Sequence, residues 1–181
     1  MGQLNLFEPK EKIEFAIEFL PLPKGYSWRF AVSGDVDPWE RPTSSCLGVS
    51  VGHFVEAGLR LPLDPLLLEL MNETTIPLWC FNLNVIRTVL SVSALNKLLD
   101  LNLGLLEIFY CFRIVPGVND MWHFSSYSDS PEMVRCLPTS QKGICDKLVM
   151  ISGGPIVPES HAGFKFPKMR SPMGKTYSIS R

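Results

Sequence analysis

One pentapeptide of the sequence has the residue types and spacing of a hydrolase nucleophile. Residues 48–52 read Gly-Val-Ser-Val-Gly and fit the pattern G-x-S-x-G, in which a tight strand-to-helix turn raises a serine beside an oxyanion hole. His123 or His161 would complete a serine, acid, histidine order along the chain. The preceding residues 41–45, Arg-Pro-Thr-Ser-Ser, contain no apolar strand to support such a turn. We therefore expect Ser50 to be an early helix residue, and a serine hydrolase is the weaker alternative.

Other residue types that bind metals or catalyse reactions are scattered along the chain. The histidines are too far apart to suggest a shared metal, and the cysteines form no C-x-x-C pair. Neither G-x-G-x-x-G nor G-x-x-x-x-G-K-[ST] occurs, so no nucleotide phosphate loop is expected. These residues are His53, His123, His161, Cys46, Cys80, Cys111, Cys136 and Cys145. The sequence predicts reduced, mostly buried thiols, no metal, no cofactor and no enzymatic activity.

Two segments carry residue types that bind nucleic acids. Residues 155–181 hold five basic side chains against the single acidic Glu159, which makes this segment the candidate contact with an RNA or DNA backbone. The basic residues are Lys165, Lys168, Arg170, Lys175 and Arg181. A mobile, solvated tail is the alternative. Residues 109–112, Phe-Tyr-Cys-Phe, would stack bases on an exposed sheet, but few basic residues accompany them and a core strand is favoured.

The composition describes a chain that packs a core. Its 181 residues fit one domain, 46% of them are hydrophobic, and the formal net charge of -1 leaves no nucleic-acid footprint over the whole chain. Residues 1–20 spread charge among apolar residues and lack the pattern of a secretory signal. The most apolar stretch, residues 98–115, contains four polar or charged residues, too many for a membrane span. We expect an intracellular protein, cytoplasmic or nuclear and not secreted, with no membrane partner.

Helical periodicity dominates the middle of the chain. Residues 1–45 are broken by prolines and predict an irregular N-terminal arm, with an amphipathic helix possible only over residues 11–20. Helices are then expected over residues 49–59, 65–71, 82–92 and 93–102. The second has the strongest start signal, an Asp64 cap followed by Pro65. In the third, Arg87 and Thr88 are expected to face away from the buried side, and in the fourth Ser93 is the expected cap and Leu95, Leu98 and Leu99 form the apolar stripe.

Past Gly104 the apolar pattern changes to a period of two. Residues 107–114 predict a strand, residues 121–127 its hairpin partner, and residues 148–151 a third strand that ends at Gly153-Gly154. A small sheet of this kind needs helices to pack against. The sequence thus predicts an α+β fold: about four helices followed by a short antiparallel sheet in a domain of residues 46–154. An irregular arm (1–45) precedes this domain and a basic, proline-rich tail (155–181) follows it.

Three segments carry a resemblance to a known family. Residues 58–66 (Gly-Leu-Arg-Leu-Pro-Leu-Asp-Pro-Leu), 137–143 (Leu-Pro-Thr-Ser-Gln-Lys-Gly) and 148–153 (Leu-Val-Met-Ile-Ser-Gly) occur in the order found in the gypsy-type transposon domain family of plants. The chain resembles this family over residues 47–154. Ile144 stands where the family usually has tryptophan, and the segment after Gly154 differs from the family's continuation. The family lies near the gag-like end of retroelement reading frames, and the resemblance implies no catalytic residues.

The sequence and the resemblance together predict a non-enzymatic, retroelement-derived, gag-like structural or interaction protein. The retroelement protease motif D-[ST]-G, the polymerase motif Y-x-D-D and zinc-knuckle cysteines are absent from the sequence. Such a protein would act by self-association or by binding partners. The alternatives are a nucleic-acid-binding module that uses the basic tail, and a decayed or truncated element fragment with no selected function.

Overall fold

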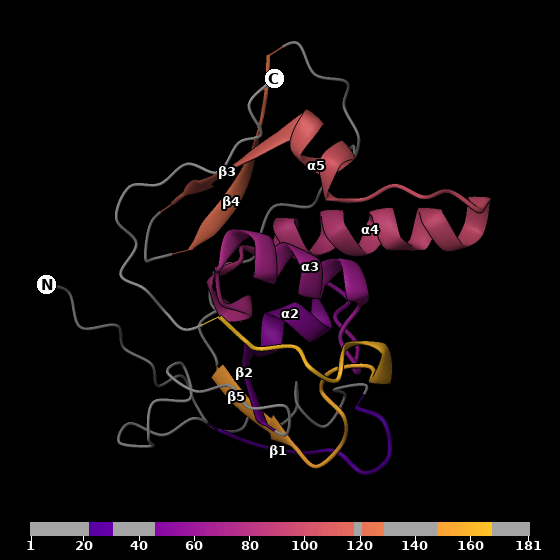
Figure 1. Ribbon diagram of the computed structural model, residues 1–181. Coiled ribbons are helices and arrows are strands. Elements are labelled where there is room, and N and C mark those ends of the chain that lie inside the picture. Colours follow the sequence, from indigo (N-terminus) through magenta and orange to yellow (C-terminus); the bar gives the residue numbers. More distant parts are fainter. Residues whose placement is uncertain (1–21, 31–45, 118–120, 129–147, 168–181) are drawn as a thin grey trace, which may run out of the picture.

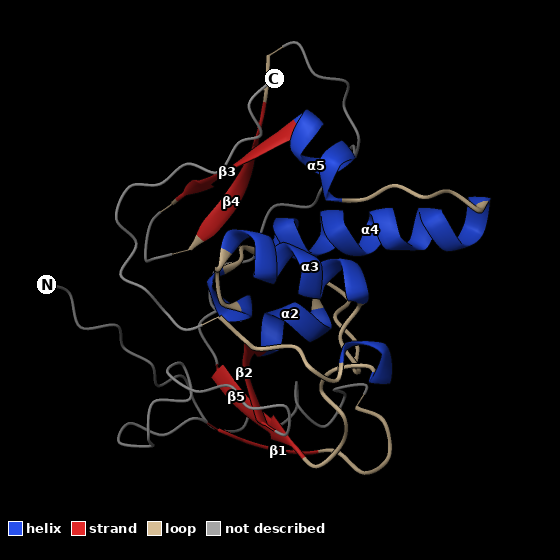
Figure 2. Cartoon of the chain, in the orientation of Figure 1, coloured by secondary structure: helices blue, strands red, loops and turns tan. Residues whose placement is uncertain are grey.

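The computed structural model describes residues 22–30, 46–117, 121–128 and 148–167 (Figure 1). Within these ranges the chain forms four α-helices, a three-stranded sheet and a two-stranded sheet, and the expected α+β class is confirmed. Figure 2 shows the helices between the two sheets, with the three-stranded sheet on one side and the hairpin on the other. The helical layer therefore has a buried face toward each sheet.

The three-stranded sheet joins both ends of the described chain. Its strands are β1 (Ser27–Phe30), β5 (Leu148–Ser152) and β2 (Cys46–Ser50), antiparallel in the order β1-β5-β2. The expected strand at residues 148–151 is confirmed, but it lies between two N-terminal strands and not beside the hairpin. Neither β1 nor β2 was expected, and β1 falls in the segment predicted as an irregular arm.

The first two helices follow strand β2. Helix α2 (Val51–Val55) begins directly after the strand, and helix α3 (Pro65–Thr74) begins as predicted at the Asp64-Pro65 signal. Asp64 Oδ1 accepts a hydrogen bond from the Leu66 amide at 3.0 Å, so one of the unpaired donors of the first turn is satisfied. The capped start fixes where α3 lies against the core, in which its leucines are buried.

Helix α4 (Leu83–Leu99) is one continuous helix where the sequence predicted two. Asn82 caps it through a 2.9 Å bond to the Asn84 amide. The Ser93 hydroxyl, expected to cap a new helix, donates instead to Asp64 Oδ2 at 2.6 Å. The Ser93 hydroxyl is thus used in a contact with the residue that caps α3, and no new helix starts at Ser93. Thr88, expected to face outward, is buried and donates to the Asn84 carbonyl.

The predicted strand over residues 107–114 is wrong in its first half, where the chain forms helix α5 (Leu105–Cys111). The Gly104 amide donates to Glu107 Oε2 at 2.7 Å, which closes the first turn and favours a helix over a strand. Strand β3 (Phe112–Pro116) starts only after this helix and pairs antiparallel with β4 (Trp122–Ser126), the expected hairpin.

Two short 3₁₀ turns complete the described structure, η1 (Leu78–Cys80) and η2 (Glu159–His161). The segment before η2 was expected to belong to a mobile tail, yet Ile156 and Val157 are buried in the core. The Leu63 amide also donates to the Ile156 carbonyl at 2.8 Å. The packed unit therefore extends beyond residue 154. Within the described part, no helix is long and apolar enough to cross a membrane.

Candidate functional site

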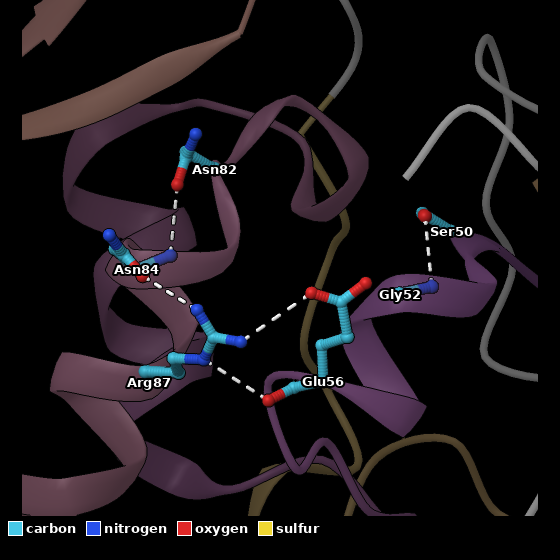
Figure 3. A network of polar contacts seen from close by, with 6 residues as sticks. All are labelled: Ser50, Gly52, Glu56, Asn82, Asn84 and Arg87. Carbon is cyan, nitrogen blue, oxygen red and sulfur yellow. Dashed lines mark hydrogen bonds and ion pairs between the residues drawn. The ribbon is translucent and has the colours of Figure 1, made fainter. Parts of the chain in front are cut away.

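Ser50, the serine of the G-x-S-x-G motif, lies at a strand-to-helix junction. The expectation that no strand precedes it was wrong, because β2 is a buried strand that ends at this residue. Ser50 nevertheless has φ −73° and ψ 142°, an ordinary extended conformation. Ser50 is 2% exposed, and its hydroxyl accepts a hydrogen bond from the Gly52 amide at 3.1 Å (Figure 3). A nucleophile elbow is strained and presents its serine to substrate, whereas this serine is buried and caps α2.

The three histidines lie in different surroundings. His53, on α2, is fully buried, and its Nε2 donates to the Phe81 carbonyl at 2.9 Å. Burial lowers the pKa of His53 from 6.5 to about 4, and the hydrogen bond to Phe81 opposes this shift only in part. His161 Nδ1 lies 2.9 Å from the hydroxyl of its neighbour Ser160, and His123 is exposed on β4. His53 and His161 therefore use their ring nitrogens in local structure.

A partly buried polar network joins the end of α2 to α4 (Figure 3). Arg87 Nη2 lies 3.6 Å from Glu56 Oε2, and both side chains are only 12% exposed. Arg87 Nε also donates to the Glu56 carbonyl at 3.1 Å, and Nη1 donates to Asn84 Oδ1 at 2.8 Å. Arg87 was expected to face away from the core, but it is held inside by these contacts. Each of the three guanidinium nitrogens of Arg87 thus faces an oxygen atom, and its charge is opposed by the Glu56 carboxylate. These contacts fix the end of α2 relative to α4.

The cysteines and acidic residues form no metal centre in the described residues. Cys46, Cys80 and Cys111 form no disulfide and the last two are buried, and burial raises the pKa of the Cys46 and Cys111 thiols. A raised thiol pKa lowers the thiolate fraction and hence the reactivity. No group of three histidine, cysteine or acidic side chains within the described ranges is placed to hold a metal ion. Cys136 and Cys145 lie outside those ranges.

The candidate nucleic-acid residues are described only in part. Lys165 is exposed, and the rings of Phe164 and Phe166 on either side of it pack edge to face, with centroids 5.1 Å apart. These two rings also pack against the core, so they anchor this stretch while Lys165 faces solvent. The other four basic residues, Lys168, Arg170, Lys175 and Arg181, lie outside the described residues.

The aromatic residues at 109–112 do not form a stacking platform. Phe109 is buried and Tyr110 is exposed on helix α5. Phe112, on β3, stacks on Phe124 of β4 with ring centroids 5.3 Å apart. The prediction that these residues belong to the core is right for Phe109 and wrong for Tyr110. A strand would have placed Tyr110 on the same side as the buried Ile108, but in a helix residues two apart point in nearly opposite directions.

Tyr110 is one of five exposed apolar side chains within residues 98–110, here called the α4–α5 apolar segment, which runs from the end of α4 through the following loop to α5. Its members are Leu98 (78% exposed), Leu99 (62%), Leu101 (43%), Leu106 (68%) and Tyr110 (61%). The sequence assigned Leu98 and Leu99 to the apolar residues of a separate fourth helix, whereas both are exposed in the last turn of α4. Helix α4 has 17 residues and α3 has 10, so the last turns of α4 extend past the helix that covers it (Figure 1).

The α5 part of the α4–α5 apolar segment has helical spacing. Leu106 and Tyr110 are four residues apart, which places them on one side of the helix, while Ile108 and Phe109 on the other side are buried. The intervening loop is tied back to α4, because the Asn96 side chain bonds both the amide and the carbonyl of Leu103 at 2.9 and 2.7 Å. The segment that carries the exposed residues is therefore fixed in place.

Comparison of the chain with protein-family models, with curated proteins and with solved structures gives no match.

Proposed function

We propose that this protein is a non-enzymatic structural or interaction protein that acts by associating with copies of itself. The exposed hydrophobic side chains of the α4–α5 apolar segment are the observation that carries the proposal. Of the six large hydrophobic side chains that are exposed among the described residues, five lie within residues 98–110. Single exposed hydrophobic residues are normal, but a concentration of them marks an interaction site.

We further propose that the chain derives from the gag-like region of a retroelement. The support is the ordered resemblance of three segments, of which residues 58–66 link α2 to α3 and residues 148–153 contain β5. The DNA on both sides of the reading frame tests this origin. Terminal repeats with a downstream protease and polymerase frame would support it, and ordinary host sequence would favour a domesticated domain or a fragment without a selected function.

Sedimentation of the purified full chain tests self-association directly. We expect the average mass to rise with protein concentration between about 1 and 100 µM, the range in which weak protein interfaces form. Apolar contacts are insensitive to salt screening, so the rise should persist in salt. A chain that stays monomeric over this range at every salt concentration would overturn the proposal.

Nucleic-acid binding by the basic segment is the second candidate, favoured by the exposure of Lys165 between its two anchored aromatic neighbours. Five phosphate contacts to single-stranded RNA predict a slope of about −3.5 for the logarithm of affinity against that of salt concentration. The probe is a labelled homopolymeric RNA followed by fluorescence anisotropy. Binding that is independent of salt, or unchanged when the five basic residues are replaced by glutamine, would exclude this candidate.

A further inference from the structure

Three chain segments that are far apart in the sequence meet beside Pro155 and Ile156. The Tyr26 hydroxyl donates to the Pro155 carbonyl, and the Leu63 amide donates to the Ile156 carbonyl at 2.8 Å. The turn before β1 and the loop between α2 and α3 therefore both contact the segment that follows β5. Figure 1 shows all three, in indigo, purple and gold, at the lower right of the molecule. The segments are residues 22–26, 57–63 and 153–167.

Each of these segments carries one exposed cation. Lys24 lies on the turn before β1, Arg60 on the loop between α2 and α3, and Lys165 on the segment after β5. Arg60 Nη1 donates to the carbonyl of its neighbour Leu59 at 2.8 Å, which holds the side chain close to its own loop. Because the three segments adjoin one another, these cations form one basic surface, here called the basic end.

Few carboxylates offset the charge of the basic end. On the three segments the one acidic residue is Glu159. Glu56 and Asp64, at the two ends of the loop between α2 and α3, are already in ion pairs with Arg87 and Lys97. The basic end therefore has an excess of positive charge, although the formal net charge of the whole chain is -1. Such an excess attracts a partner that carries phosphate groups.

Partly exposed aromatic rings accompany two of the three cations. Tyr26 is two residues from Lys24, and Phe164 and Phe166 lie on either side of Lys165. All three rings are packed against the core and remain partly open to solvent. A single-stranded nucleic acid offers phosphates to cations and base faces to aromatic rings, whereas a duplex or an anionic membrane surface offers no base faces. The combination favours a single strand.

We infer that a single-stranded nucleic acid binds across the basic end, where Lys24 and Arg60 add to the contacts of the basic C-terminal segment. The inference rests on nucleic-acid binding, the second candidate function, and adds a surface of the folded protein to it. Two further phosphate contacts steepen the expected slope, of the logarithm of affinity against that of salt concentration, from about −3.5 to about −4.9.

Variants of the full chain that lack these charges test the surface. With labelled homopolymeric RNA and fluorescence anisotropy, Lys24→Gln/Arg60→Gln should make the slope less steep by about 1.4 and lower the affinity about 25-fold at about 0.1 M salt. Lys24→Gln alone should give half of the change in slope. Arg113→Gln is the matched control, because Arg113 is exposed on β3, in the hairpin on the other side of the helical layer (Figure 2).

Thermal unfolding of each variant checks that the chain still folds. A folded Lys24→Gln/Arg60→Gln variant that binds like the wild type would overturn the inference. A loss from Arg113→Gln as large as that from Lys24→Gln would also overturn it, because the contact would then not be specific to the basic end.

Competition with unlabelled inorganic polyphosphate tests the contact with bases. Polyphosphate carries the charges without the rings, so it should bind more weakly than the RNA, most clearly at high salt, where the contribution of charge is small. Single-stranded DNA of the same length should bind within about threefold of the RNA, because phosphates and base faces are common to both. Equal binding of polyphosphate and RNA, a strong preference for one nucleic acid, or tighter binding to phosphatidylserine vesicles would overturn the inference.

The outcomes separate the inference from the candidate function on which it rests. A wild-type chain that binds no RNA overturns both. Binding with a slope of about −3.5 that is unchanged in Lys24→Gln/Arg60→Gln overturns the surface, while binding by the C-terminal segment stands. Weaker binding both in this variant and on replacement of the C-terminal basic residues by glutamine supports the inference. Those C-terminal residues are Lys168, Arg170, Lys175 and Arg181.

Discussion

Burial of His53 predicts that the protein loses stability in mild acid. The ring is fully buried on α2, and its Nε2 donates to the Phe81 carbonyl. Its other nitrogen, Nδ1, has no hydrogen-bond partner. Glu56, the residue that ends α2, is paired with Arg87. A proton on Nδ1 would therefore place an uncompensated charge in the core.

The magnitude follows from the two pKa values of this histidine. Burial lowers the pKa in the folded protein to about 4, against about 6.5 in the unfolded chain. Between these values the unfolded chain binds more protons, so stability is complete above about pH 6.5 and falls as the pH drops toward 4. A difference of about 2.5 pKa units corresponds to about 3 kcal/mol. A typical domain has only about 5–15 kcal/mol in total.

Urea denaturation between pH 8 and 4 measures this effect. The comparison is with His53→Gln, whose amide N–H can keep the bond to Phe81 but does not titrate. Carboxylates titrate in both proteins, so the difference between the two stability curves isolates the histidine. We expect the difference in the free energy of unfolding to be constant above about pH 7. By pH 4 the wild type should have lost about 3 kcal/mol more than His53→Gln. A difference that stays flat would refute the argument.

Three further substitutions test other contacts. Asp64→Ala removes the cap of α3, and urea denaturation should show a loss of about 1–2 kcal/mol. Arg87→Met leaves the Glu56 carboxylate largely buried without its cation, and the free energy of unfolding measured in urea should fall by about 3 kcal/mol. Gly154→Ala places a methyl group in the space of the Tyr26 ring, and the thermal midpoint should fall by about 5 °C or more.

Matched variants distinguish these effects from general damage. Asp64→Asn keeps an acceptor at the cap and should cost less than Asp64→Ala. Adding Glu56→Gln to Arg87→Met removes the stranded charge and should recover part of the loss. Gly163→Ala adds a methyl group in open space and should leave the midpoint unchanged. Equal losses in a variant and its control would contradict the mechanism assigned to that site.

Local signals were sufficient where a few neighbouring residues decide the structure. The Asp64-Pro65 start of α3 is an example, because its cap is a contact between residues two apart. The period of two over residues 107–114 was misleading, since it assigns Ile108 and Tyr110 to one face of a strand. Ile108 is buried and Tyr110 exposed, and the Gly104–Glu107 bond that selects the helix is a side-chain contact that periodicity does not detect.

Structure that depends on distant partners was not predictable from the sequence. Strands β1 and β2 are short, and both form by pairing with β5 near the other end of the chain. The role of Arg87 was missed for the same reason, since its carboxylate partner lies on another helix. Periodicity gives the apolar side of a helix but not the length of the element that covers it.

The difference in length between α3 and α4 explains part of the exposure of the α4–α5 apolar segment. At about 1.5 Å per residue, α3 spans about 15 Å and α4 about 25 Å. The excess length of α4 leaves Leu99 uncovered even though it lies seven residues after the buried Val92 and so on the same side of the helix. Leu98 lies on the side of the helix opposite the buried residues. Because the sequence predicted two helices over residues 82–102, the expected helix lengths could not have shown this overhang.

The central position of β5 has a consequence for the gene as well as for the protein. Ser27 and Ser152 are 125 residues apart in sequence, yet their hydroxyl oxygens lie 3.1 Å apart across the sheet. Because β1 and β2 are neighbours of β5 and not of each other, the ribosome must translate through residue 152 before either strand has a partner. A frameshift or stop codon before Leu148 yields a product with unpaired strand edges, which are prone to aggregate. Folding of the full chain therefore reports that the reading frame is intact through this strand.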